Sequence, residues 1–197
     1  MREEVTVCNF NYDSYCGIYC GACDIHLACK TGHKDHFTSV WKEPVLRAFQ
    51  KAQGNTGLAS EALQLKCHGC KSGTVFINCR TCKIRSCAID KKIDHCIDCT
   101  DYPCALHAGM KKMGDLLPHV NNNLSNLEAI KKAGVEQWLG EQEKRWKCPD
   151  CQTRFAWYWS TCRTCGRKLT GSSYEFSKVK ALLLRFGIRL ASLRKGQ

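Results

Sequence analysis

The sequence predicts a small metal-stabilised α+β protein, in which an irregular cysteine-rich domain of helices and loops precedes a helical arm, a zinc ribbon and a C-terminal amphipathic helix. Three observations lead to this prediction. Seventeen of the 197 residues are cysteines, many of them in C-x2-C pairs, which are typical of metal sites. Apolar residues follow a helical period in the cysteine-free segments. One segment between two C-x2-C pairs alternates as a β-strand does.

The composition indicates a reducing, cytoplasmic setting. The opening residues are acidic and polar, unlike a secretion signal, and no segment is long and apolar enough to span a membrane. In such a setting repeated C-x2-C pairs favour metal binding over disulfides. Because the cysteine count is odd, we expect Cys8 to be a leftover buried thiol and not a ligand.

The formal net charge of +12 would by itself suggest a nucleic-acid partner. Each zinc ion held by four thiolates adds a net charge of about −2, so three or four such sites would leave about +6 or +4. The last fifty residues still carry ten lysines and arginines against two acidic residues. We therefore expect a protein or nucleic-acid partner to contact this end of the chain.

The cysteines fall into three groups, which divide the chain into four expected units. These are a cysteine-rich metal-binding domain over residues 1–112, a helical arm over 113–147, a zinc ribbon over 148–171 and a basic amphipathic helix over 172–197.

The first group contains three cysteines in the pattern C-x3-C-x2-C: Cys16, Cys20 and Cys23. This spacing also occurs where an iron–sulfur cluster is open to a substrate, which makes an iron–sulfur redox or cluster-dependent protein the alternative function. Such enzymes build a barrel from alternating strands and helices, and residues 30–147 show no such pattern. We therefore favour one corner of a metal-bound scaffold, completed by Cys29, His26, a central cysteine or an external ligand.

A short helix is predicted after this group. Residues 39–54 place Val45, Leu46 and Phe49 at helical spacing, with Pro44 at the first position and Gly54 after the end. We expect this helix to pack beside the metal sites.

The central group consists of eight cysteines, in which one triplet repeats 17 positions later: Cys67 and Cys70, then Cys79, Cys82 and Cys87, then Cys96, Cys99 and Cys104. Eight thiolates make two complete four-thiolate sites. One division joins the first four cysteines and the last four, and a cross-braced division fits the spacing equally well. Zinc is favoured over an iron–sulfur cluster, because paired C-x2-C turns suit closed tetrahedra. His68 and His95 adjoin these positions, and we expect each to be solvated or to support a ligand rather than to replace a cysteine.

The helical arm presents Ser125 and Glu128 at the spacing of a capping box. Leu127 and Trp138 can share one buried face, and Gly134 is expected to divide the helix.

The third group has the spacing of a zinc ribbon, two C-x2-C pairs separated by ten residues: Cys148, Cys151, Cys162 and Cys165. Each pair is expected to form a tight turn, and two turns complete a closed tetrahedron around zinc. Between the pairs, residues 155–160 alternate as in a strand. Because four cysteines leave no open position on the metal, we expect a structural zinc ion and not a catalytic one.

The ribbon and the last segment contain candidate partner contacts: Arg154, Trp157, Trp159, Arg163, Arg167, Arg185 and Arg189. Unpaired bases stack on such aromatic rings beside basic groups. The interpretation that we favour is that the aromatic rings pack on the helical arm.

The final segment is predicted to be a helix with a second capping box at Ser172 and Glu175. Its larger apolar residues form one stripe: Val179, Leu182, Leu183, Phe186, Leu190 and Leu193. Such a basic amphipathic helix can lie on a membrane, bind a partner or cover the protein's own core. We favour docking of this stripe on the protein's own core.

A resemblance to a known family is carried by three stretches: YCGIYCGACDIHLAC, CHGCKSG and NCRTCKIRSCAIDKKIDHCIDCTDYPC. They are similar to an uncharacterised cysteine-rich family of bacterial and archaeal proteins, a domain of unknown function, over about residues 13–110. The later NLEAIKKAGVEQWLGEQEKRWKCPDC and CRTCG resemble the extension of a subset of that family, which ends in a zinc ribbon. Eleven cysteines between Cys16 and Cys104 match the family pattern, whereas Cys29 does not. The resemblance implies metal binding and no particular reaction.

No general base, nucleophile or phosphate-binding loop stands out in the sequence. We therefore expect a cytoplasmic zinc-binding protein with three or four zinc sites. It is expected to act as a non-catalytic binding, adaptor or regulatory module for a macromolecular partner.

Overall fold

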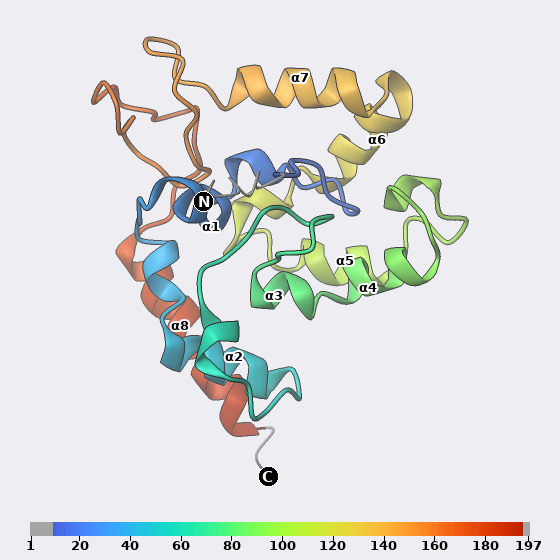
Figure 1. Ribbon diagram of the computed structural model, residues 1–197, viewed down its shortest axis with the longest axis vertical. Coiled ribbons are helices and arrows are strands. Elements are labelled where there is room, and N and C mark those ends of the chain that lie inside the picture. The colour runs from blue at the N-terminus through green and yellow to red at the C-terminus, as the bar shows by residue number, and fades with distance from the viewer. Residues whose placement is uncertain (1–9, 195–197) are drawn as a thin grey trace, which may run out of the picture.

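The computed structural model describes residues 10–194, and Cys8 lies outside them. The described residues form eight α-helices (Figure 1): α1 (Asp24–Thr31), α2 (Glu43–Ala52), α3 (Ile77–Arg80), α4 (Lys83–Asp90), α5 (Ala105–Lys111), α6 (Asn123–Ala133), α7 (Val135–Arg145) and α8 (Lys178–Arg194). Short 3-10 helices lie between them: η1 (Cys20–Ala22), η2 (Thr38–Val40), η3 (Ser60–Leu63), η4 (Cys96–Asp98) and η5 (Pro118–Val120).

The expected α+β class is wrong, because the described residues contain no sheet. About 50% of the chain is helical and 3% is extended, the latter as isolated bridges. The predicted strand over residues 155–160 is irregular, and its first five side chains are all buried. The N–H of Trp157 donates to the carbonyl of Ala22 (2.9 Å), and the carbonyl of Trp157 accepts from the N–H of Tyr174 (2.7 Å). These single hydrogen bonds to two different segments do not form a β-ladder. Alternation predicts one buried face, but here the protein covers both faces.

The helix predicted over residues 39–54 is confirmed as α2. Pro44 lies in its first turn, where the missing N–H would have no partner within the helix. The division of the arm is also confirmed, because α6 ends at Ala133 and Gly134 takes a φ of +83° before α7 begins. This backbone conformation is one that glycine adopts without a steric penalty.

Neither predicted capping box forms. α6 begins after Asn122, and the Ser125 hydroxyl, already inside the helix, donates to the Asn122 carbonyl (3.0 Å). α8 begins at Lys178, where the hydroxyl of Ser177 accepts from the Lys180 N–H (3.2 Å). The Ser-x-x-Glu spacing predicts helix starts after Ser125 and Ser172, but the helices begin at Asn123 and Lys178.

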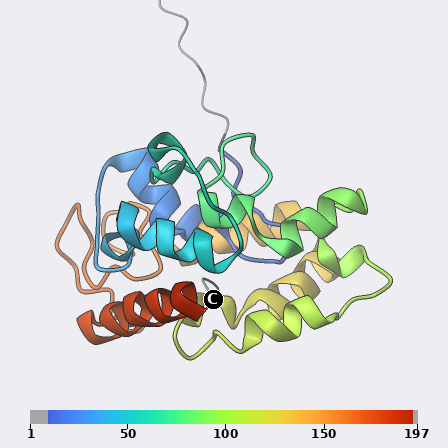
Figure 2. The same cartoon turned by 90° about the horizontal axis from the view of Figure 1, so that it is seen from below.

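α8 packs beside α2, and both views show the two helices side by side (Figures 1 and 2). The face of α8 that becomes buried is made of Ala181, Leu184, Ile188 and Ser192. The expectation that the stripe of larger apolar residues covers the core is therefore wrong, because those six side chains are 41–67% exposed. The small side chains of Ala181 and Ser192 let the axes of the two helices approach closely, which favours the narrower face.

The main hydrophobic core joins the ribbon to the N-terminal half of the chain. Trp138, Trp146 and Phe155 are its largest fully buried side chains. Trp157 stacks on His119, with ring centroids 4.1 Å apart and planes 8° apart. The aromatic segment of the ribbon thus packs against the η5 turn and α1 as well as the arm.

Gly17 provides a test of this packing. It has a φ of +84°, and an added Cβ would lie 2.3 Å from the carbonyl oxygen of Asn123 in α6. Gly32, which ends α1 with a φ of +74°, has open space around it. We expect Gly32→Ala to lower the free energy of unfolding by about 1 kcal/mol, and Gly17→Ala by about 3 kcal/mol because a steric clash adds to the backbone cost. Urea unfolding measures both, and equal losses would contradict close contact between Gly17 and α6.

Candidate metal centres

The ribbon consists of two turns of the same geometry, displaced by 14 residues. In the first, the N–H of Cys148 donates to Thr153 and the N–H of Gln152 donates to Cys148. The second repeats these bonds from Cys162 to Arg167 and from Gly166 to Cys162, at 2.7 and 3.0 Å. The residue after the second cysteine of each pair has positive φ, +58° at Gln152 and +75° at Gly166. The positive φ reverses the direction of the backbone in each turn, so that the two cysteines of the pair face the same point.

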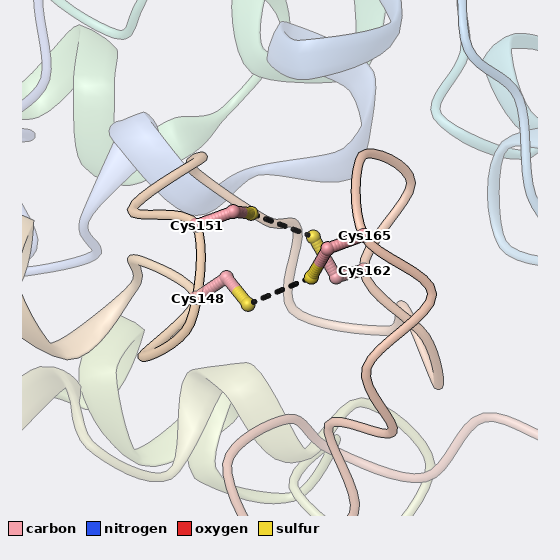
Figure 3. A group of neighbouring side chains, drawn as sticks. All are labelled: Cys148, Cys151, Cys162 and Cys165. Carbon is pink, nitrogen blue, oxygen red and sulfur yellow. Dashed lines mark hydrogen bonds between the residues drawn. The ribbon is translucent and has the colours of Figure 1, made fainter.

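The four ribbon sulfurs form a closed group (Figure 3). All lie within 4.8 Å of one another, with Cys148 and Cys165 at 3.6 Å and Cys151 and Cys162 at 3.5 Å. A zinc–sulfur bond of about 2.3 Å implies sulfur–sulfur separations of about 3.8 Å in a tetrahedron. Hydrogen bonds from Thr153 lower the pKa of the Cys151 thiol to about 6, which favours the thiolate that a metal needs. These residues can hold one metal ion.

A second set of thiols lines one cavity of about 310 Å³ between α4 and α5. Its cysteines are the last four of the central group: Cys87, Cys96, Cys99 and Cys104. The ammonium of Lys91 lies 3.2 Å from the sulfur of Cys99, and Nδ1 of His107 lies 3.6 Å from the sulfur of Cys104. This grouping agrees with the division of the central cysteines in which the last four form one site, and not with the cross-braced division.

The three cysteines of the first group lie near the first four cysteines of the central group. These seven are Cys16, Cys20, Cys23, Cys67, Cys70, Cys79 and Cys82. Burial raises the pKa of Cys20, and the thiols of Cys70, Cys23 and Cys67 raise it further. Burial likewise raises the pKa of Cys16, and the thiol of Cys82 raises it further. After burial, the thiol of Cys16 is also the largest influence that raises the pKa of Cys70 and of Cys96. Cys70 therefore lies near both Cys16 and Cys20, so the first group and the central group share one thiol-rich region.

Cys29 and His26 are the sequence candidates for a fourth ligand of the first group. Cys29 lies near Cys67, whose pKa is raised by burial and, to a smaller extent, by Cys29. His26 is fully buried against the rings of Phe10 and Tyr12, with centroids 5.0 and 5.5 Å away. Burial lowers the pKa of His26 to about 4, so its imidazole is neutral at pH 7. Neither ring nitrogen has a hydrogen-bond partner among the described residues.

Asp13 connects the segments that carry these thiols, a role that sequence reasoning missed. Its buried carboxylate accepts hydrogen bonds from His95 Nε2 (2.9 Å), Lys71 Nζ and Asn11 Nδ2. Burial opposes ionisation of Asp13, but the bonds from His95 and Lys71 outweigh it and hold the pKa below its usual value. His95 thus supports the site through Asp13. Lys91 and His107 were also missed, although each follows a cysteine by one helical turn.

The candidate partner contacts are not brought together. Trp157 and Trp159 are each only 5% exposed, so their faces are not open to a stacked base. The guanidinium of Arg154 lies over the ring of Tyr12 at 4.4 Å and bonds Glu143, and Arg185 donates to the Ser39 carbonyl. Within the set, Arg163 does lie over the ring of Trp159, at 5.5 Å from its centroid. Arg167 instead pairs with Asp150, and Arg189 is exposed on α8, so the set forms no single surface.

Comparison with known proteins confirms the family resemblance. Residues 12–108 match the model of a family described as protein of unknown function (DUF3795). The match covers the first two cysteine groups and ends before the ribbon. No curated protein and no solved structure matches the chain. A search of the described helices found none that is long and apolar enough to cross a bilayer.

Asp13 and Asp94 form a matched pair for testing the connection between the thiol segments. Both contact Lys71 and His95, but Asp13 is buried and the side chain of Asp94 is 72% exposed. We expect Asp13→Asn to cost about 3 kcal/mol at pH 7, because it removes the buried carboxylate that pairs with the largely buried ammonium of Lys71. Asp94→Asn should cost less than about 1 kcal/mol. Chemical unfolding of both variants measures the difference.

The pH dependence of the same variants tests the charge of Asp13. Its folded pKa lies below the unfolded value of about 3.9, so its stabilisation is present above that pH and is lost as the pH falls toward the folded pKa. We expect the stability difference between the unmodified protein and Asp13→Asn to shrink as the pH falls below about 4. A difference that stays constant with pH would show that the Asp13 carboxylate charge is not the stabilising group.

Proposed function

We propose that this protein is a non-catalytic binding module whose ribbon holds a structural zinc ion and whose C-terminal helix binds a protein partner. The observation that carries this proposal is the outward face of α8, where six large apolar side chains are 41–67% exposed. They are Val179, Leu182, Leu183, Phe186, Leu190 and Leu193. A contiguous apolar face of this kind is typical of an interaction site.

The charges beside this face suggest what the partner offers. At 100° per residue, the six apolar residues share one side of α8, with Arg189 and Lys178 along one edge and Arg194 along the other. An apolar groove with acidic residues at its rim would complement both features. Nucleic acid is the weaker candidate, because phosphates would leave the apolar stripe in water and the tryptophans of the ribbon are buried.

The rest of the molecule holds α8 in place for such a contact. Its inner face packs on α2, and the guanidinium of Arg185 bonds the carbonyl of Ser39 at 2.8 Å. The ribbon, from which α8 emerges, packs into the main core through Trp157 and Tyr158. A zinc ion in the ribbon would therefore stabilise the base of the binding helix. Because none of the sixteen described cysteines is in a disulfide, a reducing cytoplasmic setting suits this arrangement.

The alternative function, an iron–sulfur protein that uses Cys16, Cys20 and Cys23 as an open site, receives less support. All three have thiols of the central group nearby: Cys20 has Cys67 and Cys70, Cys23 has Cys67, and Cys16 has Cys70, Cys82 and Cys96. Because each of the three thiols has other thiols as neighbours, they do not form the separate, substrate-accessible site that this alternative requires.

The zinc ion in the ribbon is tested by removing one ligand. We expect Cys165→Ser to lower the zinc content by about one ion per chain and to lower Tm, because metal-binding energy becomes folding energy. Thr164→Ala, beside it and outside the sulfur group, is the control and should leave both unchanged. Metal analysis and thermal unfolding give the answer. Unchanged zinc content, or iron lost in place of zinc, would contradict a zinc ribbon.

The partner surface is tested with a photo-crosslinking amino acid at position 186 in α8. The control carries the same amino acid at position 83, an exposed residue of α4. We expect one discrete protein adduct from position 186 in cells, and none from position 83. Adding Leu182→Glu should reduce the adduct about tenfold or more, because burial of a leucine contributes about 1.5 to 3 kcal/mol. Adducts with lipid or nucleic acid, or none, would contradict a protein partner.

A further inference from the structure

The cavity between α4 and α5 is much larger than a single metal ion requires. Its volume is about 310 Å³, whereas a cavity that holds one water molecule needs only about 10 to 15 Å³. In a four-thiolate zinc site the sulfurs touch around the ion and enclose no space of this kind. The volume therefore points to a larger inorganic group.

The sulfurs that line the cavity do not form a zinc-sized group. Among residues 10–194, the ribbon is the one group in which three or more candidate ligand atoms all lie within 4.8 Å of one another. Any three of the cavity's four sulfurs therefore include a pair farther apart than 4.8 Å. Zinc would require about 3.8 Å between all of them. The two sites differ within the same chain, so the ribbon serves as an internal reference for a zinc-sized site.

The walls of the cavity suit an iron–sulfur cluster. Between the thiols they are apolar, formed by Ile84, Ala88, Ile93, Tyr102 and Leu106. One cation, Lys91, reaches the sulfur of Cys99 at 3.2 Å and pairs with Asp101 at the exposed edge. Apolar surroundings and N–H···S contacts are the features by which proteins stabilise such clusters and set their reduction potentials.

We propose that Cys87, Cys96, Cys99 and Cys104 bind a [4Fe–4S] cluster, and that Lys91 tunes it through Cys99. The four thiols supply one ligand to each iron, as four-cysteine cubane sites require. A cubane spreads its cysteine ligands farther apart than a single ion does, which fits a cavity whose described sulfurs form no zinc-sized group. The site is separate from the ribbon and from α8, so it goes beyond the proposed binding function. It also differs from the open site considered at Cys16, Cys20 and Cys23.

The experiment uses the full chain, purified without oxygen and reconstituted with ferric iron, sulfide and a thiol reductant, which supplies the two electrons that four ferric ions need to reach the [4Fe–4S]2+ state. We expect about four irons and four acid-labile sulfides per chain, visible charge-transfer absorption, and an electron paramagnetic resonance signal after one-electron reduction by dithionite. Cys99→Ala should lose most of this iron. The control Cys165→Ala should keep the iron and lose zinc, because its thiol belongs to the ribbon. A colourless protein that takes up zinc alone would overturn the proposal.

A second variant keeps all the ligands and so avoids the risk that a cysteine variant fails to fold. Lys91→Met removes the N–H···S contact and a positive charge, and Lys83→Met removes an exposed lysine that does not line the cavity. We expect Lys91→Met to lower the reduction potential, since it removes groups that stabilise the more negative reduced cluster, and Lys83→Met to leave it unchanged. A reduction potential that is the same in both variants would contradict tuning of the cluster by Lys91. Iron that is lost in Cys23→Ala and kept in Cys99→Ala would place the cluster elsewhere and overturn the proposal.

Discussion

Burial of cysteine thiols is the constraint on which the rest of this structure depends. The helices that carry them are short, four residues in α3 and eight each in α1 and α4, and isolated helices of that length are not stable in water. Burial raises the pKa of Cys20 and Cys79 well above the usual value, so without a metal these thiols are neutral and hold nothing together. Metal binding would displace their protons and convert the same burial into cross-links between segments.

The hydrophobic core adds a second connection, between the two ends of the chain. Trp157 bonds the carbonyl of Ala22, and the N–H of Tyr158 donates to the buried carboxyl of Asp24 (3.3 Å). These contacts place the ribbon directly on η1 and α1, next to Cys20 and Cys23. The ribbon thus carries four cysteines that could hold a metal ion and also forms a large part of the core beside the other thiols. This explains why its aromatic residues are buried and not available to a partner.

The sequence predicts those features that depend on local chemistry. The four ribbon ligands, α2 with Pro44 in its first turn and the break at Gly134 all follow from residue type and spacing. The orientation of α8 does not, because both of its sides carry apolar residues and periodicity alone cannot tell which side meets α2. The strand expected at 155–160 was wrong for a related reason: alternation describes a segment with one buried face, and contacts distant in sequence bury both. The roles of Asp13, Lys91 and His107 likewise depend on tertiary contacts.

The C-x2-C motif itself shows where sequence spacing stops being informative. In the ribbon, the N–H of the residue after each pair donates to the first cysteine, and that residue has positive φ, as Gly166 does at +75°. In the pairs that begin at Cys20, Cys79 and Cys96, the second cysteine's own N–H donates to the first cysteine's carbonyl at 3.1 to 3.2 Å. These pairs lie in helical turns, and their sulfurs join no zinc-sized group within the described part of the chain. A positive-φ residue after the pair is therefore the local feature that separates the compact ribbon site from the wider sites, and equal spacing does not imply the same metal.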